Sequence, residues 1–179
     1  IIKADQAMYI SKDGGRNRLH IYHPDDDELL QRHADMQWVS RLRKAIDENR
    51  FCLYAQPIVP VARPDTPVHY EILVRLRDEQ GQLVPPNAFI PAAERYNLMP
   101  QIDRWVLRTT LGFLRDLSDS SQVAVNVSGQ SLCDADFLRF AIDQISETGI
   151  DPRRICFEIT ETAAIAHLNL ASHFISMLH

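Results

Sequence analysis

Apolar and polar positions divide the chain into a short N-terminal part and a longer part of strands and helices. Residues 3–22 predict a helix that leads into an alternating strand. Residues 24–28 hold a proline and four acidic side chains, a stretch with nothing to bury, so we place a boundary near His23. Residues 29–49 predict a linker helix that packs against a neighbouring part and acts as a stiff coupler. Its apolar face carries Trp38, Leu42 and Ile46.

From residue 50 onward, predicted strands and helices alternate. The strands are Phe51–Val59, Tyr70–Leu76, Val123–Val127 and Ile155–Ile159. The helices are Asn87–Arg95, Gln101–Leu117, Asp134–Glu147 and Thr162–Leu178. The first two strands are joined by a proline-rich connection and predict a hairpin, and the later strand–helix alternation predicts parallel βαβ units. The fold class that follows is α/β.

Three polar residues interrupt strands that are otherwise apolar, namely Glu71, Asn126 and Glu158. Burying an ionised carboxylate alone is strongly unfavourable, so each Glu needs a cation, a partner or an exposed position. At the C-terminal ends of parallel strands these side chains would meet at one mouth. Two carboxylates and one amide carbonyl suit a hard divalent ion such as Mg²⁺ or Mn²⁺. The alternative is that each Glu pairs with an Arg or lies on an exposed edge.

Glu71, Leu73 and Arg75 share one face of their strand because side chains alternate with a period of two. A carboxylate and a guanidinium therefore line the same wall. In a functional site the Glu would hold a metal and the Arg would bind a phosphate. In a purely structural arrangement the two side chains would form a salt bridge.

Composition and charge narrow the function classes. The 45% hydrophobic, 8% aromatic and 24% charged content of the 179 residues is that of a globular protein. The formal net charge of −5 argues against binding to a nucleic-acid polymer. No apolar run reaches the roughly 20 residues of a membrane segment. The three cysteines, Cys52, Cys133 and Cys156, form no CxxC pair and suit a reducing cytoplasm.

Six short motifs follow one another between residues 50 and 166. They are Tyr54–Val59, Glu71–Leu73 with Arg75, Pro86–Glu94, Ile102–Leu107, Val125–Ser128 and Phe157–Thr162. Together they resemble the EAL domain family, whose known activity is hydrolysis of the bacterial second messenger cyclic di-GMP. The resemblance implies a TIM-type (β/α) barrel, which in its usual form runs about 250 residues.

The N-terminal part resembles a second family. Ala4–Lys12 and Gly15–Arg18 are similar to the closing helix and strand of a GGDEF domain, the diguanylate cyclase family that synthesises the same messenger. The two resemblances imply a piece of a bacterial, cytoplasmic GGDEF–EAL signalling protein. We expect a GGDEF tail over residues 1–23, an acidic linker and linker helix over 24–49, and the N-terminal half of an EAL domain over 50–179.

The EAL resemblance implies that Glu71, Asn126 and Glu158 are metal ligands, for Mg²⁺ or Mn²⁺. The implied reaction is metal-assisted hydrolysis of a phosphodiester bond of cyclic di-GMP, with the linear dinucleotide as product. The paired Asp segment, the catalytic Lys and the other ligands of the family are not identified in this chain.

Three further positions match functional residues of the family. Arg75 matches a phosphate-contacting arginine, Gln56 matches a substrate-contacting position, and Glu161 matches an acidic residue that helps to hold an active-site loop. Two positions depart from the family pattern. Ile72 stands where the signature has Ala, and Leu76 stands where Trp is frequent. Neither departure removes a functional group.

The 130 residues of 50–179 supply roughly half of a barrel. We therefore expect the parent protein to hydrolyse cyclic di-GMP and this chain alone to be inactive. One alternative is a degenerate domain that binds cyclic di-GMP as a sensor without cleaving it, and another is a fragment with no activity of its own. A half barrel leaves a strand edge open, which favours pairing with another chain, for instance as a homodimer.

Overall fold

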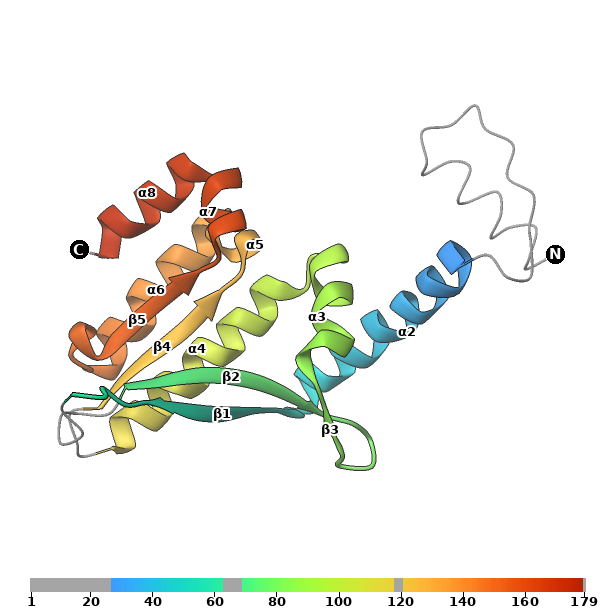
Figure 1. Ribbon diagram of the computed structural model, residues 1–179, viewed down its shortest axis with the longest axis horizontal. Helices are drawn as coiled ribbons and strands as arrows, with labels where there is room; N and C mark the ends of the chain where they lie inside the picture. The colour runs from blue at the N-terminus through green and yellow to red at the C-terminus, as the bar shows by residue number, and fades with distance from the viewer. Residues whose placement is uncertain (1–26, 63–68, 118–120, 179) are drawn as a thin grey trace. The chain divides into compact units, whose positions relative to one another are not determined.

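The computed structural model describes residues 27–62, 69–117 and 121–178 (Figure 1). The chain divides into two units, Ile1–Arg41 and Leu42–His179, which are described separately. The helix and strand predicted for residues 3–22, and with them the expected GGDEF tail, lie outside the described residues.

Helix α2 (Asp27–Asp47) corresponds to the predicted linker helix and begins two residues earlier. In the first unit, the guanidinium carbon of Arg41 lies 4.2 Å from the ring centroid of Trp38. In the second unit, Leu42 is fully buried. The end of α2 thus takes part in the core of the second unit, and its role as a coupler stays a prediction.

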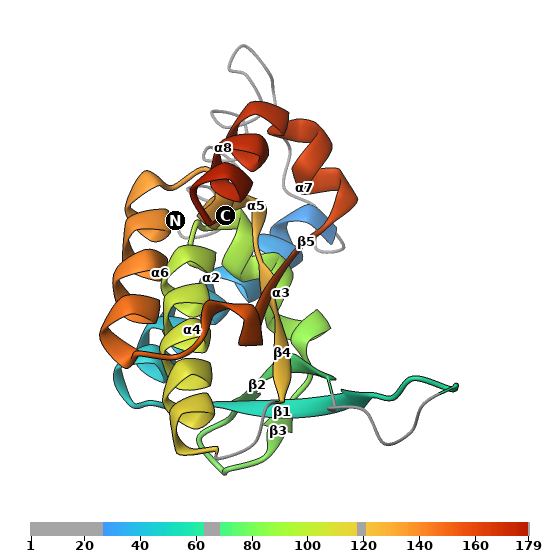
Figure 2. The same cartoon turned by 90° about the vertical axis from the view of Figure 1, so that its left-hand side faces the viewer.

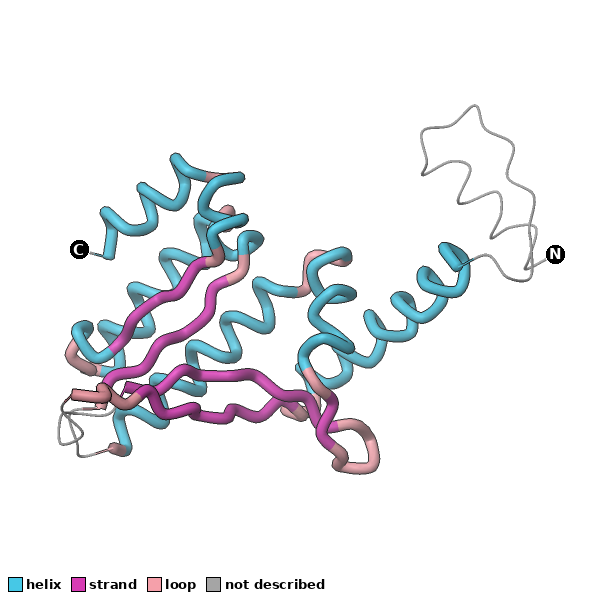
Figure 3. Tube along the Cα trace, in the orientation of Figure 1, coloured by secondary structure: helices cyan, strands magenta, loops and turns pink. Residues whose placement is uncertain are grey.

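The second unit is built on one mixed sheet. Its strands are β1 (Phe51–Ile58), β2 (His69–Arg77), β3 (Leu83–Val84), β4 (Gln122–Val127) and β5 (Ile155–Ile159). The strand order is β1-β2-β4-β5, and β3 pairs with β2. Strands β1 and β2 are antiparallel, as the predicted hairpin requires, and β4 runs parallel to both β2 and β5 (Figure 1). Figure 3 shows the strands in magenta and the helices between them in cyan. This topology confirms the predicted parallel βαβ units and the α/β class.

Helices connect the parallel strands. They are α3 (Pro86–Arg95), α4 (Met99–Asp116), α5 (Gly129–Leu132), α6 (Ala135–Thr148), α7 (Glu161–Ala166) and α8 (Leu168–Leu178), with a 3₁₀ turn at Pro152–Arg154. The sequence pattern missed α5 and β3 because both are shorter than one apolar repeat. It also joined α7 and α8 into one helix, whereas the backbone leaves the helical conformation at His167, where φ is −133°.

The core lies between the sheet and the helices α4 and α6, which cover one face (Figure 2). Alternate residues of the central strands are buried toward this side, among them Ile72, Leu76, Val123, Val125 and Val127. Aromatic rings close one end of the core, where Phe51 lies 6.0 Å from Phe89 and 5.6 Å from Trp105 between ring centroids. The Trp105 Nε1–H donates a hydrogen bond to Asn49 Oδ1 at 2.7 Å. Helix α4 is thereby tied to the chain that follows α2.

Helix α6 ends at Gly149, whose φ of 67° is in the left-handed region. A Cβ atom at this position would meet no heavy atom within 4 Å, so a side chain adds only backbone strain. We expect Gly149→Ala to lower the free energy of unfolding by about 1 kcal/mol. Gly112→Ala is the matched control, because Gly112 lies inside α4 with equally open space and should gain stability. Urea denaturation checks both, and equal losses would contradict the expectation.

Candidate functional site

Four of the residues predicted to form the site lie in a row across the sheet. Gln56 of β1 is the register partner of Glu71 in β2, and Asn126 of β4 is the register partner of Glu158 in β5. Glu71 is paired with Ala124, which lies two residues before Asn126 and therefore on the same face. The structure thus places all four side chains on one face, although they come from four strands.

This face of the sheet is the one opposite α4 and α6, and in the described part of the chain no helix covers it (Figure 2). Gln56, Asn126 and Glu158 are exposed, and Glu71 is partly buried. Within the described residues, this face of the strands is therefore open and not buried. The carboxylates avoid the cost of burial because they lie on an open face.

Glu71 and Asn126 are in direct contact. The Asn126 Nδ2 donates a hydrogen bond to Glu71 Oε1 at 3.0 Å, which leaves the amide carbonyl oxygen of Asn126 available. In the described part of the chain, neither Glu71 nor Glu158 forms an ion pair. Two uncompensated carboxylates beside an amide carbonyl are the oxygen donors that a hard divalent cation prefers. The described residues contain no metal-binding group of three or more His, Cys, Asp or Glu, so this donor set is a partial one.

Arg75 lies four residues after Glu71 and faces the same side of β2. Its Nη1 donates to the carbonyl of Val74 at 2.9 Å, and its guanidinium carbon lies 5.6 Å from the Tyr54 ring centroid. Arg75 and Glu71 do not form the salt bridge that the sequence left open. The guanidinium is instead held by a backbone carbonyl and an aromatic face, with N–H groups left for an anion.

One predicted site residue, Glu71, lies differently from the expectation. Glu71 is the third residue of the nine-residue β2, not a residue at its C-terminal end. Strand β2 continues past β4 because its second half pairs with β1 and with β3. Glu161 lies in the first turn of α7 and is exposed, and its carboxylate forms no hydrogen bond or ion pair with the described residues. Its role in holding a loop stays a prediction.

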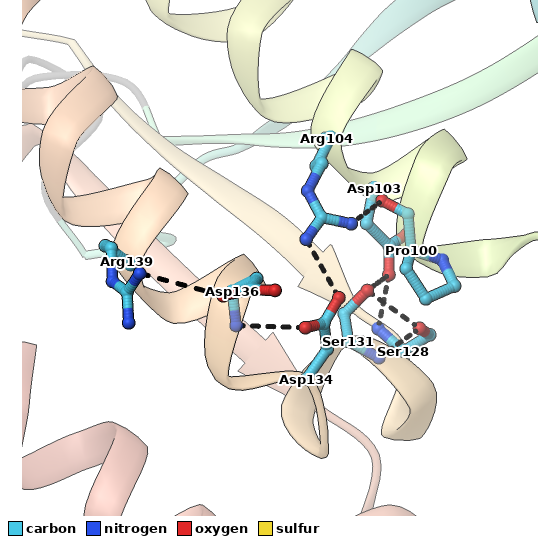
Figure 4. Close-up of polar contacts among 8 residues, drawn as sticks. All are labelled: Pro100, Asp103, Arg104, Ser128, Ser131, Asp134, Asp136 and Arg139. Carbon is cyan, nitrogen blue, oxygen red and sulfur yellow. Dashed lines mark hydrogen bonds and ion pairs between the residues drawn. The ribbon is translucent and has the colours of Figure 1, made fainter.

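The sequence did not single out a buried polar cluster at the end of β4 (Figure 4). Asp103 of α4 is only 5% exposed, and its Oδ2 accepts hydrogen bonds from the Ser128 backbone N–H at 3.0 Å and from Ser131 Oγ at 2.7 Å. The next residue, Arg104, pairs with Asp134 at 2.8 Å. The available signal was Asp103 itself, a carboxylate inside the apolar stripe of a helix.

These two aspartates titrate differently. Burial raises the pKa of Asp103, and the hydrogen bonds from Ser128 and Ser131 only partly oppose that rise. For Asp134, partial burial also raises the pKa, but the hydrogen bonds from Arg104 and from the Asp136 N–H outweigh it and leave the pKa below its ordinary value. Asp103 is therefore the group whose charge opposes folding near neutral pH.

The raised pKa of Asp103 predicts a pH-dependent stability. Between the unfolded pKa of about 4 and the higher folded pKa, the folded state binds more protons than the unfolded state. Protonation of Asp103 therefore stabilises the folded state. This stabilisation is complete below about pH 4 and is lost as the pH rises through the pKa of Asp103 in the folded state. Relative to Asp103→Asn, the unaltered chain should gain stability on acidification from pH 7 to 4. Urea denaturation at several pH values checks this, and a constant difference would contradict it.

A cavity of about 730 Å³ lies beside the polar cluster. It is lined by the starts of α5 and α7, including Ser128 and Thr160, and by Asp134 and His167. The strand residues of the row do not line it. The candidate site therefore lies on the open face of the sheet, outside this cavity.

Within the described residues, no helix has both the length and the apolar character of a membrane span.

Comparisons with known proteins agree on one family. The family model described as the EAL domain matches residues 39–179. The chain is 36% identical over 165 residues to the cyclic di-GMP phosphodiesterase PdeB of Shewanella oneidensis, which covers 90% of this chain and 19% of that protein. It is 34% identical over 136 residues to the cyclic di-GMP phosphodiesterase PdeF of Escherichia coli, covering 74% of this chain and 18% of that protein.

A solved structure gives the same answer for the fold. The EAL domain of FimX from Pseudomonas aeruginosa, bound to c-di-GMP, matches with a TM-score of 0.72 and 30% identity over 79% of this chain and 59% of that chain. The match thus spans less than a fifth of PdeB and of PdeF, and about three fifths of the solved FimX chain. Since the family model covers most of the sequence, the chain belongs to the EAL domain family.

Proposed function

We propose that this chain supplies one side of a divalent-metal and phosphate site with which an EAL protein hydrolyses cyclic di-GMP to the linear dinucleotide. The observation that carries the proposal is that three members of the row, Glu71, Asn126 and Glu158, share the open face with Arg75. The names of PdeB and PdeF, both cyclic di-GMP phosphodiesterases, support the substrate.

The chain's own residues would hold the metal and orient the substrate. Glu71 and Glu158 carry the charge that attracts Mg²⁺ or Mn²⁺, and Asn126 adds a neutral oxygen. Arg75, steadied by the Tyr54 ring, would bind a phosphate, and Gln56 extends the donor row toward the substrate. A bound divalent ion supplies the activation of water for attack on phosphorus.

Three oxygen donors leave about half of the six positions around Mg²⁺ to water. We therefore propose that the chain by itself binds cyclic di-GMP weakly and does not cleave it. Binding without cleavage is also the second candidate function, and the FimX EAL domain solved with c-di-GMP bound supports the binding part of it.

The three cysteines are free, which supports the proposal of a reducing, cytoplasmic location.

Calorimetric titration of the chain with cyclic di-GMP in Mn²⁺ tests the proposal. Arg75→Met should abolish measurable binding, because the phosphate of the bound ligand loses the guanidinium that neutralises its charge. Arg139→Met is the control, since Arg139 lies exposed on α6. Chromatography of the same mixtures should show no linear product. Equal binding by the Arg75 variant and the unaltered chain would overturn the phosphate role, and turnover would overturn the statement that the chain alone is inactive.

The free edge of β5 supports a further proposal, that copies of the chain self-associate. Strand β5 is the last strand of the described sheet and pairs only with β4. Exposed apolar side chains follow it in α7 and α8, including Ile165 and Leu168. Sedimentation velocity over a range of concentrations tests this, and a constant monomer would contradict it.

A further inference from the structure

The end of β4 is held by a carboxylate from a different element. Ser128, the residue directly after β4, donates its backbone N–H to Asp103 Oδ2 at 3.0 Å. Ser131 Oγ donates to the same oxygen at 2.7 Å, and Ser131 is fully buried (Figure 4). Asp103 in turn lies on the buried side of the 18-residue α4. A rigid helix therefore fixes the backbone at the exit of this strand.

This contact lies two residues from Asn126, whose amide donates to Glu71. Helix α5, which begins after its N-cap Ser128, has only four residues and is too short to be stable by itself. Without Asp103, the backbone at Ser128 would lose a buried acceptor and the first turn of α5 would lose its outside support. The position of the Asn126 side chain depends on that backbone, because Asn126 is the next-to-last residue of β4.

We propose that Asp103 is a positioning residue for Asn126: by binding the Ser128 N–H and the Ser131 hydroxyl, its carboxylate sets the end of β4 and keeps the Asn126 amide beside Glu71. The use of Asn126 toward a metal rests on the proposed function, whereas the positioning itself does not.

The same helix provides a matched comparison. Arg104, the next residue along α4, pairs with Asp134 at 2.8 Å, and Asp134 caps the start of α6 through the Asp136 N–H at 2.9 Å. This second clamp resembles the first in kind, since a side chain of α4 holds the start of a following helix. Asp134, however, lies eight residues after Asn126 along the chain. Loss of the Arg104–Asp134 pair should therefore destabilise the chain without moving the Asn126 amide.

The test uses the full 179-residue chain and two readouts. The first is the side-chain NH₂ signal pair of Asn126 in a ¹⁵N correlation spectrum, assigned by its loss in Asn126→Asp. The second is the affinity for Mn²⁺, measured from the free-ion EPR signal. Asp103→Ala should shift the Asn126 signals and weaken Mn²⁺ binding about 10–100-fold, the range for residues that orient a ligand. Asp103→Asn, which keeps one acceptor oxygen, should restore part of both.

Asp134→Ala should lower stability while leaving both readouts unchanged. If Asp103→Ala does not fold, Ser131→Ala replaces it, since that variant removes one of the two hydrogen bonds to the carboxylate. It should shift the Asn126 signals in the same direction by less. Unchanged Asn126 signals in the Asp103 and Ser131 variants, or equal shifts in Asp134→Ala, would overturn the positioning role. Absence of Mn²⁺ binding by the unaltered chain would instead overturn the proposed metal site, and the amide signals would still decide the role of Asp103.

Discussion

Replacing Phe137 by alanine is expected to lower the free energy of unfolding by about 3–5 kcal/mol. Phe137 of α6 is fully buried, and its ring centroid lies 6.4 Å from those of Phe140 and Phe174. Phe174 of α8 also packs edge-on against Phe157 of β5 at 5.7 Å. Truncation would therefore leave a cavity where α6, α8 and β5 meet.

Urea denaturation followed by circular dichroism measures this loss. Phe113→Ala is the control, because Phe113 lies on α4 with 51% of its surface exposed and should change stability by less than about 0.5 kcal/mol. If Phe137→Ala is unfolded from the start, Phe137→Leu should give a smaller, measurable loss. Similar losses for Phe113→Ala and the Phe137 variants would contradict this description of the core.

The second large effect is expected on metal binding. Glu71→Gln removes a charge but keeps an oxygen that accepts from Asn126, so it separates the electrostatic role from the hydrogen bond. We expect this variant, and likewise Glu158→Gln, to weaken Mn²⁺ binding at least about tenfold, since each carboxylate supplies charge that the amide cannot replace.

The free-ion EPR signal of Mn²⁺ during titration gives the affinities. Glu147→Gln is the matched control, since Glu147 is exposed on α6, where its carboxylate accepts a hydrogen bond from Gln144 Nε2 at 2.8 Å. Its affinity should equal that of the unaltered chain. An unchanged affinity in the Glu71 and Glu158 variants would show that Mn²⁺ binds elsewhere, and the open face of the sheet would lose its assignment.

Three members of the row, Glu71, Asn126 and Glu158, could be predicted from the residues alone, because they interrupt apolar strands. Gln56, the fourth member, was implied only by the EAL resemblance. A period of two then assigns Glu71 and Arg75 to one face, and strand–helix alternation makes β4 and β5 parallel neighbours. The pattern of apolar and polar residues does not specify the register between strands, which puts Asn126 opposite Glu158. It also does not specify that Glu71 lies early in β2, because the length of that strand depends on its pairing with β1 and β3.

The Asp103 cluster could not be predicted from local periodicity. Its partner Ser128 is 25 residues away in sequence, and nothing in the spacing of apolar residues specifies which backbone N–H a buried carboxylate will bind. The same reason explains the Trp105–Asn49 hydrogen bond, which spans 56 residues. Contacts of this kind depend on how the elements pack, so they are found only when the fold is known.

The one-face row also decides which changes in chain length the site can tolerate. Inserting or deleting a single residue within β1 would turn Gln56 to the helix-covered side, and the same change in β4 before Asn126 would separate the amide from Glu71. The turn at Asp78–Gln82 lies beyond Glu71 and Arg75, and extra residues there leave their alternation intact. Among EAL sequences of varied length, insertions should therefore gather in such turns and be absent from the strand segments that carry the row.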